Sequence, residues 1–393
     1  MEIIKLKNMN KFSLHEPHLK GRENYNVRQC IVSGWLSPSG NFVNQFEKKL
    51  ENFTKGNVVC CNSGTSALHV SLILAGVKPG NEVIVPSITF IATVNAVLYC
   101  NANPIFMDCD ETLSIHVDKV LSFLKHNTYL SRNFTYNKKT KKKITAIMFT
   151  NVFGNLPNLK NLHNECKKRN IKLIEDAAES LGSFYLKRKK HSGLNADYGT
   201  ISFNVNKIIT TGAGGAILFN NKKEKNKIKK LISQGKSDNL LFKHDLLGYN
   251  YGMPNINAAI GCAQLENINN ILFKKKKINL YYRNFFSKTK NIKLIQISND
   301  QKQNHWLNAI QIKKINYSNF KKNIKLLISL GIDVRPVWYP CHKQVHLKKY
   351  ENYNIEIANN VYKNILCLPS SYFLKDNDLS NICKKILNVF EKK

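Results

Sequence analysis

From about residue 55, short apolar runs alternate with segments that place apolar residues at helical spacing. This pattern predicts strands at 58–61, 82–86, 104–108, 144–150 and 171–176, with helices at 66–75, 89–100, 117–124 and 158–169 between them. Such alternation indicates βαβ units, in which helices cover both faces of a mostly parallel sheet. In an α/β fold of this kind the ligand binds outside the carboxyl ends of the strands.

Two segments depart from the alternation. The polar run 127–143 predicts an exposed insertion. Beyond about residue 255 the pattern changes to a long helical stretch, a few short strands and two terminal helices. At 393 residues the chain is too long for one small domain. We therefore expect a large domain at 1–252, including an N-terminal arm, and a smaller α+β domain at 253–393.

The formal net charge of +34 raises the question of a nucleic-acid partner. The lysines form scattered short runs, and asparagine is used as freely as lysine. We interpret this as a composition bias over tolerant surface sites, with no nucleic acid as the main partner. A positive field would still attract a diphosphate-bearing substrate. The alternative, a nucleic-acid-binding relative, would give a salt-sensitive DNA shift.

The ten cysteines form no C-x-x-C pair and no Cys/His spacing that suits a metal. We interpret Cys60 and Cys61, which lie in an apolar stretch, as buried free thiols. The N-terminus lacks an apolar signal core, and no segment has the length needed to cross a bilayer. The sequence thus predicts a cytoplasmic protein without metal or membrane contact.

Three motifs carry the candidate chemistry, and the first is NSGTSAL at 62–68. A Gly-containing turn that runs into a helix offers free backbone N–H groups and a positive dipole end to a phosphate. Thr65 and Ser66 add hydroxyl donors. An ordinary helix N-cap explains the same residues, so this motif alone decides nothing.

The second motif is Asp176, at the end of the apolar run 171–176. A carboxylate there can keep a pyridine nitrogen protonated, which turns the ring into an electron sink. A helix N-cap is the alternative, with Glu179 as its capping-box partner.

The third motif surrounds Lys207, which lies between two β-like runs among apolar and small residues. Lysines shielded from water become nucleophiles that can form an imine with a carbonyl. Most lysines in so basic a chain are solvated, but the flanks of Lys207 cannot form an exposed charged face. The three motifs together are typical of a pyridoxal phosphate (PLP) site.

Four ordered segments, NSGTSALHVSLILAGVKPGNEVIVPSITFIAT, IKLIEDAAES, SFNVNKIITTGAGG and GYNYGMPNINAAIGCAQLE, resemble the DegT/DnrJ/StrS family of sugar aminotransferases. The resemblance extends from about Val32 to Leu368. The segment SFNVNKIITTG, the stretch before RPVWYPCHK and the polar insertion near residue 135 are similar to the branch that serves legionaminic acid and bacillosamine-type sugar synthesis.

The resemblance implies a type I PLP-dependent transferase fold and a ping-pong cycle. Glutamate would give its amino group to PLP, which would pass it to a nucleotide-linked 4-keto-6-deoxy, 2-acetamido hexose for a surface glycan. Lys207 would form the imine and shuttle the proton, Asp176 would bind the ring nitrogen, and Glu179 would contact the ring oxygen.

The resemblance also assigns the remaining contacts, in a homodimer with shared active sites. The residues that would hold the phosphate or stack on the ring are Thr65, Ser66, Ser202 and Phe90, with Asn250 reaching the phosphate from the other subunit. Trp35 and His342 would line the sugar site, although ordinary packing explains each of them as well.

Two positions depart from the family pattern. Gly252 replaces the arginine of Asn-Tyr-Arg-Met, a candidate anchor for the carboxylate of the amino donor, which also raises the possibility of a decayed enzyme. Ala213 replaces the acid of GEGG, where the glycines supply the turn. A further alternative is a PLP-dependent sugar dehydratase, but such enzymes carry His where this chain has Lys207.

Overall fold

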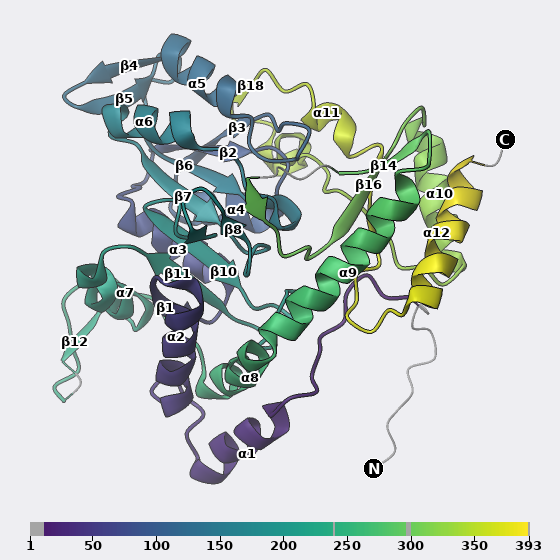
Figure 1. Cartoon of the computed structure of the whole chain (residues 1–393). Helices are drawn as coiled ribbons and strands as arrows, with labels where there is room; N and C mark the ends of the chain where they lie inside the picture. Colours follow the sequence, from purple (N-terminus) through teal and green to yellow (C-terminus); the bar gives the residue numbers. More distant parts are fainter. Residues whose placement is uncertain (1–11, 239, 296–299, 392–393) are drawn as a thin grey trace.

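The computed structural model describes residues 12–238, 240–295 and 300–391 (Figure 1). The segment 1–11, which holds most of the N-terminus examined for a signal core, lies outside the described residues.

A large sheet forms where the sequence places its buried apolar runs. Its strands are β1 (Asn57–Cys61), β2 (Glu82–Pro86), β3 (Asn103–Met107), β6 (Lys143–Thr150), β7 (Lys172–Asp176), β10 (Tyr198–Ser202) and β11 (Gly215–Phe219). They follow the order β1-β11-β10-β7-β6-β2-β3. The neighbours from β10 to β3 are parallel, and β11 is antiparallel to both β1 and β10. The predicted mostly parallel sheet is confirmed.

Helices cover both faces of this sheet (Figure 1). One face carries α3 (Gly64–Leu74), α4 (Ile91–Tyr99) and α7 (Lys225–Ile232), and the other carries α2 (Asn41–Thr54), α5 (Val117–His126), α6 (Lys160–Arg169) and α8 (Asn255–Glu266). Strand β2 shows how the side chains are divided. Val83 and Val85 pack with the first group of helices, whereas Ile84 packs with α5 and α6. Adjacent residues of a strand face opposite sides, so a strand covered on both faces has apolar residues at successive positions.

Most residues of the run 127–143 are exposed or half-buried, as the prediction of an exposed insertion requires, but the run also contributes a strand to the large sheet. Residues in this run form β4 (Thr128–Ser131) and β5 (Phe134–Asn137), and β5 pairs with β6 in the large sheet. The polar side chain of Asn137 is fully buried and donates to Glu82 Oε2 at 3.1 Å and Glu351 Oε2 at 2.6 Å. The hydrogen bonds of Asn137 make its burial possible, because a polar group without such partners is costly to bury.

A second layer follows the long helix α9 (Ile268–Phe286), which crosses Figure 1 diagonally. It consists of the antiparallel sheet β14 (Ile292–Leu294), β16 (Asn308–Ile312), β19 (Ile365–Leu368) and β17 (Arg335–Pro336), with helices α10 (Tyr317–Ser329) and α12 (Asp376–Glu391). The chain between these strands returns to the large sheet, where β18 (Asn352–Tyr353) pairs with β3.

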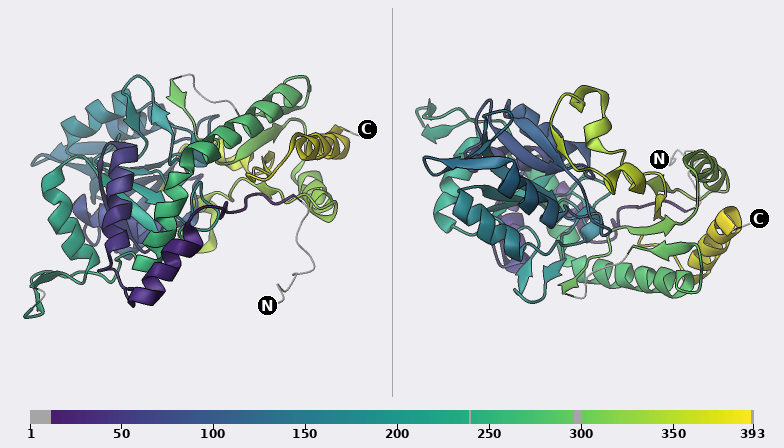
Figure 2. Two further views of the ribbon diagram at one scale, coloured as in Figure 1. Left: turned by 60° about the horizontal axis from the view of Figure 1, so that its bottom comes forward. Right: turned by 90° about the horizontal axis from the view of Figure 1, so that it is seen from above.

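Shorter elements complete the described part of the chain. They are α1 (Glu23–Ser33), β8 (Phe184–Tyr185), β9 (Lys190–His191), β12 (Lys236–Asp238), β13 (Lys243–His244), β15 (Gln301–Lys302) and α11 (Ala358–Val361). The β12–β13 hairpin projects from the body of the molecule in Figures 1 and 2. Its tip exposes Leu241 and Phe242.

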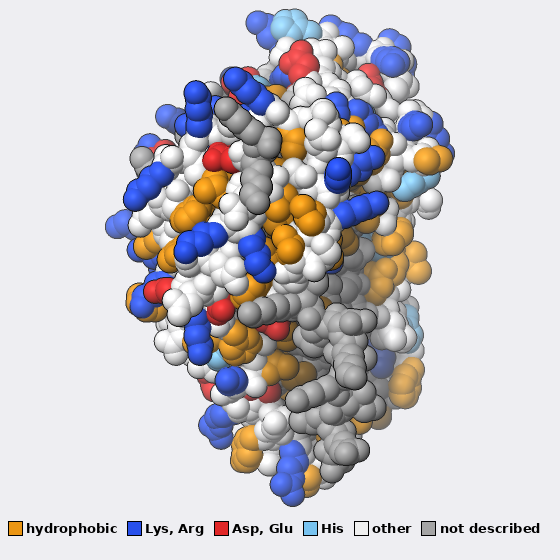
Figure 3. Space-filling view, turned by 90° about the vertical axis from the view of Figure 1, so that its right-hand side faces the viewer, with side chains coloured by type: hydrophobic (Ala, Val, Ile, Leu, Met, Phe, Trp, Pro, Cys, Tyr) orange, Lys and Arg blue, Asp and Glu red, His pale blue; other side chains and the backbone are white. Residues whose placement is uncertain are grey.

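The composition predicts that the lysines are spread over surface sites. On the face shown in Figure 3, lysine and arginine side chains lie scattered among neutral ones. Lys275 contradicts this interpretation, because it belongs to the run Lys274 to Lys277 and is nevertheless completely buried. The described helices include none that is both apolar enough and long enough to span a bilayer.

Candidate functional site

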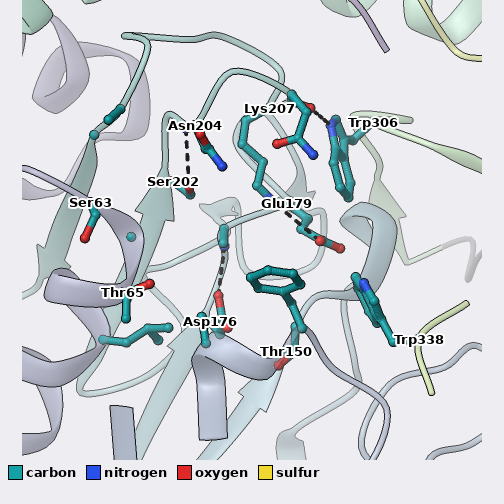
Figure 4. Close-up of a pocket in the computed structure, with 18 residues that line it drawn as sticks. Ser63, Thr65, Thr150, Asp176, Glu179, Ser202, Asn204, Lys207, Trp306 and Trp338 are labelled. Carbon is teal, nitrogen blue, oxygen red and sulfur yellow. Dashed lines mark hydrogen bonds and ion pairs between the residues drawn. The ribbon is translucent and has the colours of Figure 1, made fainter. Parts of the chain in front are cut away.

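A cavity of about 310 Å³ lies at the carboxyl ends of β7 and β10, where a parallel sheet is expected to bind its ligand (Figure 4). All three predicted motifs contribute to its lining. The lining residues with polar side chains are Ser63, Thr65, Thr150, Asp176, Glu179, Ser202, Asn204, Asn206 and Lys207. The apolar part of the lining includes Leu68, Phe90, Trp306 and Trp338.

One end of the cavity is the first turn of α3. The hydroxyl of Ser63 caps this helix by accepting from the backbone N–H of Ser66 at 3.0 Å. The N-cap alternative therefore holds for the motif, while Ser63, Gly64 and Thr65 still line the cavity. Ser66 does not line it, because its hydroxyl donates to Asn62 Oδ1 at 2.7 Å. The helix start and the nearby hydroxyl groups suit an anion.

Glycine makes the close approach at this end possible. A Cβ atom on Gly215, at the start of β11, would lie 2.5 Å from the backbone nitrogen of Gly64. Gly212 has a φ of 79°, in the left-handed region that glycine tolerates. The turn of the GAGG segment therefore forms with Ala213, which replaces the family's acid and lines the cavity.

Asp176 lies at the bottom of the cavity, at the end of β7. Its Oδ2 accepts from the Thr93 hydroxyl at 2.6 Å, and its Oδ1 accepts from the backbone N–H of Ala178 at 3.1 Å. Burial raises the pKa of Asp176 in spite of these two donors and the charge of Lys207. A buried carboxylate of this kind gains from a cation placed beside it. Thr93, on α4, fixes the carboxylate; it is the last residue of the first quoted segment, but the sequence predicted no role for it.

Glu179 is held from two sides. Its Oε2 accepts from the backbone N–H of Phe153 at 2.9 Å, and its Oε1 lies 3.3 Å from Nζ of Lys207. Phe153 directs its N–H to this carboxylate from a left-handed conformation, with φ 54° and ψ 23°. A bulky side chain seldom adopts such angles, which cost about 1–3 kcal/mol. Burial raises the pKa of Glu179, and the nearby charge of Lys207 opposes that shift.

Lys207 lies in the loop between β10 and β11, with its side chain 14% exposed. Its Nζ faces Glu179 and lies 4.2 Å from the centre of the Trp306 ring. The three residues before it, 204–206, are exposed but uncharged. Among the described residues that line the cavity, Lys207 is the only lysine or arginine.

The other predicted residues differ in their relation to the cavity. Phe90 lines it and is 56% exposed. Asn250, Trp35 and His342 do not line it in this chain. Asn250 is exposed and its backbone carbonyl accepts from Nδ2 of Asn62 at 3.2 Å, Trp35 is 58% exposed, and His342 Nδ1 lies 2.6 Å from the hydroxyl of Ser87.

Two positions bear on the binding of the amino donor: Gly252, where the family has arginine, and Arg335, our alternative candidate for an anchor. Neither lines the cavity within this chain. A Cβ atom on Gly252 would lie 3.0 Å from Cβ of Pro38. Arg335 is exposed and forms an ion pair with Asp333.

Sequence reasoning missed two tryptophans in the lining. Trp338 lies within the quoted segment RPVWYPCHK, so its signal was present in the sequence. Trp306 follows β15 and is joined to Asn206, one hundred residues earlier, by a hydrogen bond from its indole N–H. No local pattern could have revealed that contact.

The geometry defines the chemistry that the cavity can support. An anion fits at the start of α3, a cationic ring nitrogen fits at Asp176, and a carbonyl carbon can react with the amine of Lys207. PLP combines these three groups in one molecule. The residues present therefore fit this cofactor.

Comparison with known proteins gives the same result. The model of the DegT/DnrJ/EryC1/StrS aminotransferase family matches residues 17–387. The chain is 33% identical over 390 residues to GDP-perosamine synthase of Escherichia coli O157:H7, covering 97% of this chain and 99% of that protein. It is 30% identical over 357 residues to UDP-4-amino-4,6-dideoxy-N-acetyl-beta-L-altrosamine transaminase of Campylobacter jejuni (strain 81-176), covering 90% and 91%.

The fold is also found among solved structures. PseC of Helicobacter pylori, an aminotransferase involved in the biosynthesis of pseudoaminic acid, superimposes with a TM-score of 0.86. The alignment covers 97% of this chain and 99% of PseC, at 24% identity. The type I fold predicted from the sequence is confirmed.

Proposed function

The chain belongs to the DegT/DnrJ/EryC1/StrS aminotransferase family, a PLP-dependent family, and we propose that it transfers an amino group from glutamate to a nucleotide-linked 4-keto-6-deoxy hexose. The observation that carries the proposal is the meeting of Lys207, Asp176 and the turn at 63–65 in one cavity. These residues lie far apart in the sequence but come together at the carboxyl ends of neighbouring strands.

The phosphate of PLP is assigned to the turn at the start of α3. Thr65, Ser63 and Ser202 line that end of the cavity, and Ser66 supports the turn through Asn62. The positive end of the helix and its unpaired N–H groups favour a dianion there.

The ring of PLP is assigned to the space above Asp176. The carboxylate of Asp176 binds the ring nitrogen, Glu179 contacts the ring oxygen, and Phe90 stacks on the ring. When bound, PLP supplies an electron sink for the carbanion that forms when the substrate loses a proton. Thr93 and Ala178 keep the Asp176 carboxylate in place through their hydrogen bonds.

Lys207 carries the cofactor and moves the proton. Its Nζ is the only lysine amine among the described residues that line the cavity, so it alone can attach PLP there. When it is not attached to the cofactor, the amine would hold the proton taken from the substrate carbon.

The sugar is assigned by resemblance. The similarity to the legionaminic acid and bacillosamine-type branch supports a 2-acetamido hexose destined for a surface glycan. One relative is named for GDP-perosamine and another for a UDP-linked N-acetyl sugar, and both names support a nucleotide-linked substrate for this chain. Trp35 and His342 remain our candidates for contacts to the sugar.

A homodimer completes the proposal. Asn250 and Trp35 are exposed and do not line the cavity of their own chain, which suits residues that serve the other subunit's site. The proposed function includes no nucleic-acid partner. The ten cysteines of the described chain are free and buried, which suits the reducing cytoplasm that the sequence predicts.

The attachment of the cofactor provides the first test. Purified protein with PLP should absorb visible light, and borohydride should remove that absorbance and leave a phosphopyridoxyl group on the peptide that contains Lys207. An adduct on another lysine, or none with PLP present, would contradict the assignment.

The substrate provides the second test. The protein is incubated with PLP, glutamate and a panel of GDP-, UDP- and dTDP-linked 4-keto-6-deoxy sugars, with and without a 2-acetamido group. Mass spectrometry should detect an amino sugar from the acetamido member. If the protein aminates only sugars that lack the acetamido group, it is still an aminotransferase, but the proposed 2-acetamido substrate is wrong.

A further inference from the structure

Trp306 contacts both Lys207 and the backbone beside it. The indole Nε1–H donates to the carbonyl oxygen of Asn206, the residue before Lys207, at 2.6 Å. The face of the ring lies 4.2 Å from Nζ of Lys207, within the range of a cation–π contact (Figure 4). One side chain thus fixes the loop that carries the lysine and provides a surface for its ammonium group.

Trp306 is itself held firmly, because it is 3% exposed and both of its backbone polar groups are bound. Its N–H donates to Asn304 Oδ1 at 3.0 Å, and Asn304 Nδ2 donates to the carbonyl of Glu179 at 2.8 Å. Its carbonyl accepts from Nζ of the buried Lys275 at 3.1 Å.

Lys275 joins three parts of the chain. It extends from α9, and its Nζ donates to the carbonyl of Trp306 and, at 2.5 Å, to the carbonyl of Ser370 after β19. A completely buried lysine is rare unless its donors are bound. Here both bonds serve to fix the segment from which the indole reaches the cavity.

We propose that Trp306 is a positioning residue that holds the amine of Lys207 in the cavity whenever it is not attached to the cofactor, and that Lys275 fixes Trp306 for this task. The inference rests on the proposed function for the role of Lys207. The amine has two partners in the cavity, the Glu179 carboxylate at 3.3 Å and the Trp306 ring.

The physical need arises from the length of the lysine side chain. A free lysine gains much rotamer entropy by leaving a defined position, and the loop before Lys207 is exposed at 204–206. A proton shuttle must instead stay within reach of the reacting carbon. A carboxylate on one side and an aromatic face on the other restrict the amine without a covalent bond.

The test measures the reactivity of Lys207 in cofactor-free protein. A limiting amount of acetic anhydride labels the amines, and mass spectrometry compares Lys207 with Lys187, whose side chain is 79% exposed. We expect Trp306→Leu to raise the relative labelling of Lys207 several-fold. Trp306→Phe, which keeps a ring but loses the indole N–H, should give a smaller increase.

Trp338→Leu is the matched control, because Trp338 lines the same cavity but is neither of the two residues, Glu179 and Trp306, that hold Nζ of Lys207. Equal labelling in wild type and Trp306→Leu would overturn the proposal. An equal increase in Trp338→Leu would overturn it too, because wider access alone would then explain the effect.

Lys275→Met tests the second half of the inference. If this variant folds, Lys207 labelling should rise as in Trp306→Phe, and an unchanged value would remove Lys275 from the proposal. Borohydride trapping of PLP on wild-type Lys207 is recorded separately. Failure of that trapping would reject the proposed function, whereas the labelling of cofactor-free protein reports only on the position of the amine.

Discussion

The adjacent residues Glu175 and Asp176 of β7 both carry a carboxyl group, but their positions on the strand give them different environments. Asp176 faces the cavity, whereas Glu175 is bound on the other side by Asn151, Tyr185 and Asn195. Burial raises the pKa of both carboxyl groups. Only Asp176 can meet a ligand, so the strand directs one carboxylate to chemistry and the other to structure.

The Asp176→Asn substitution tests that division. The amide oxygen of Asn can still accept from the N–H of Ala178, and the amide NH2 can donate to the hydroxyl oxygen of Thr93, so the variant should fold and bind PLP. It carries no negative charge to stabilise a protonated ring nitrogen, and transamination should fall on the order of 10²-fold. The rate at which glutamate converts the bound cofactor to its amino form, followed by absorbance, is the measurement.

Glu175→Gln is the control on the same strand, and it should lose far less activity because Glu175 does not line the cavity. The amide oxygen of Gln can still accept from Asn151 and Tyr185, although the N–H of Asn195 loses its acceptor. Near-normal turnover in Asp176→Asn would mean that another residue serves the ring nitrogen.

At the scale of the elements, the sequence predicts those helices and strands that a local pattern of apolar residues defines. Strands 144–150 and 171–176 were predicted to within one residue of β6 and β7, because strands covered on both faces are continuous apolar runs. The hairpin at 128–137 was missed, since its buried Asn137 depends on Glu351, more than two hundred residues away. Lys275 was missed for the same reason, as its partners are distant carbonyl groups.

The buried Lys275 of α9 should make the free energy of unfolding depend on pH. Burial lowers the pKa of Lys275 to about 7, whereas an unfolded lysine has a pKa of about 10.4. Between these values the unfolded chain binds a proton that the folded chain lacks, so the contribution of Lys275 to stability rises with pH. The slope is at most about 1.4 kcal/mol per pH unit. A neutral amine keeps two hydrogens, enough for the carbonyls of Trp306 and Ser370.

Denaturant unfolding of the cofactor-free protein at pH 7, 8 and 9 provides the measurement. The stability of wild type relative to Lys275→Met should increase across this series, because only wild type has the buried lysine. Lys276→Met, with the exposed neighbour replaced, should show no such trend. A parallel pair of curves for wild type and Lys275→Met would contradict the prediction.

At the scale of the whole molecule, we propose that the site of one chain is completed by a second chain. The cofactor cavity is formed within the chain, but the described residues that line it include no arginine and no lysine besides Lys207. Gly252 and Asn250, which the family pattern connects with the site, lie outside the lining. Their contribution therefore belongs to the interface that we propose between two subunits.

Gly252→Arg tests whether a donor anchor can be restored. The φ angle of Gly252 is not in the left-handed region, and Pro38 must shift by only a few tenths of an ångström to admit a side chain. A charge-assisted pair contributes roughly 1.5–3 kcal/mol, so the KM for glutamate should fall by about tenfold or more. Gly252→Met, of similar length but without charge, should leave the KM unchanged. The same KM in wild type and Gly252→Arg would mean that another group, with Arg335 as the candidate, binds the donor.

The last prediction concerns subunit exchange. If Asn250 completes the site of the other subunit, a dimer of Lys207→Ala and Asn250→Ala chains has both defects in one site and none in the other. Mixing these two inactive variants should restore part of the activity, in proportion to the mixed dimers formed.

The control for this experiment uses two residues of one cavity. Lys207 and Asp176 line the same cavity of a single chain, so mixing Lys207→Ala with Asp176→Asn leaves one defect in each site. That mixture should stay inactive under the same exchange conditions. If exchange is demonstrated and the Asn250→Ala mixture also stays inactive, Asn250 serves its own subunit. A second subunit would then no longer be required to hold the phosphate, and Trp35 would be the one residue still assigned to the other subunit's site.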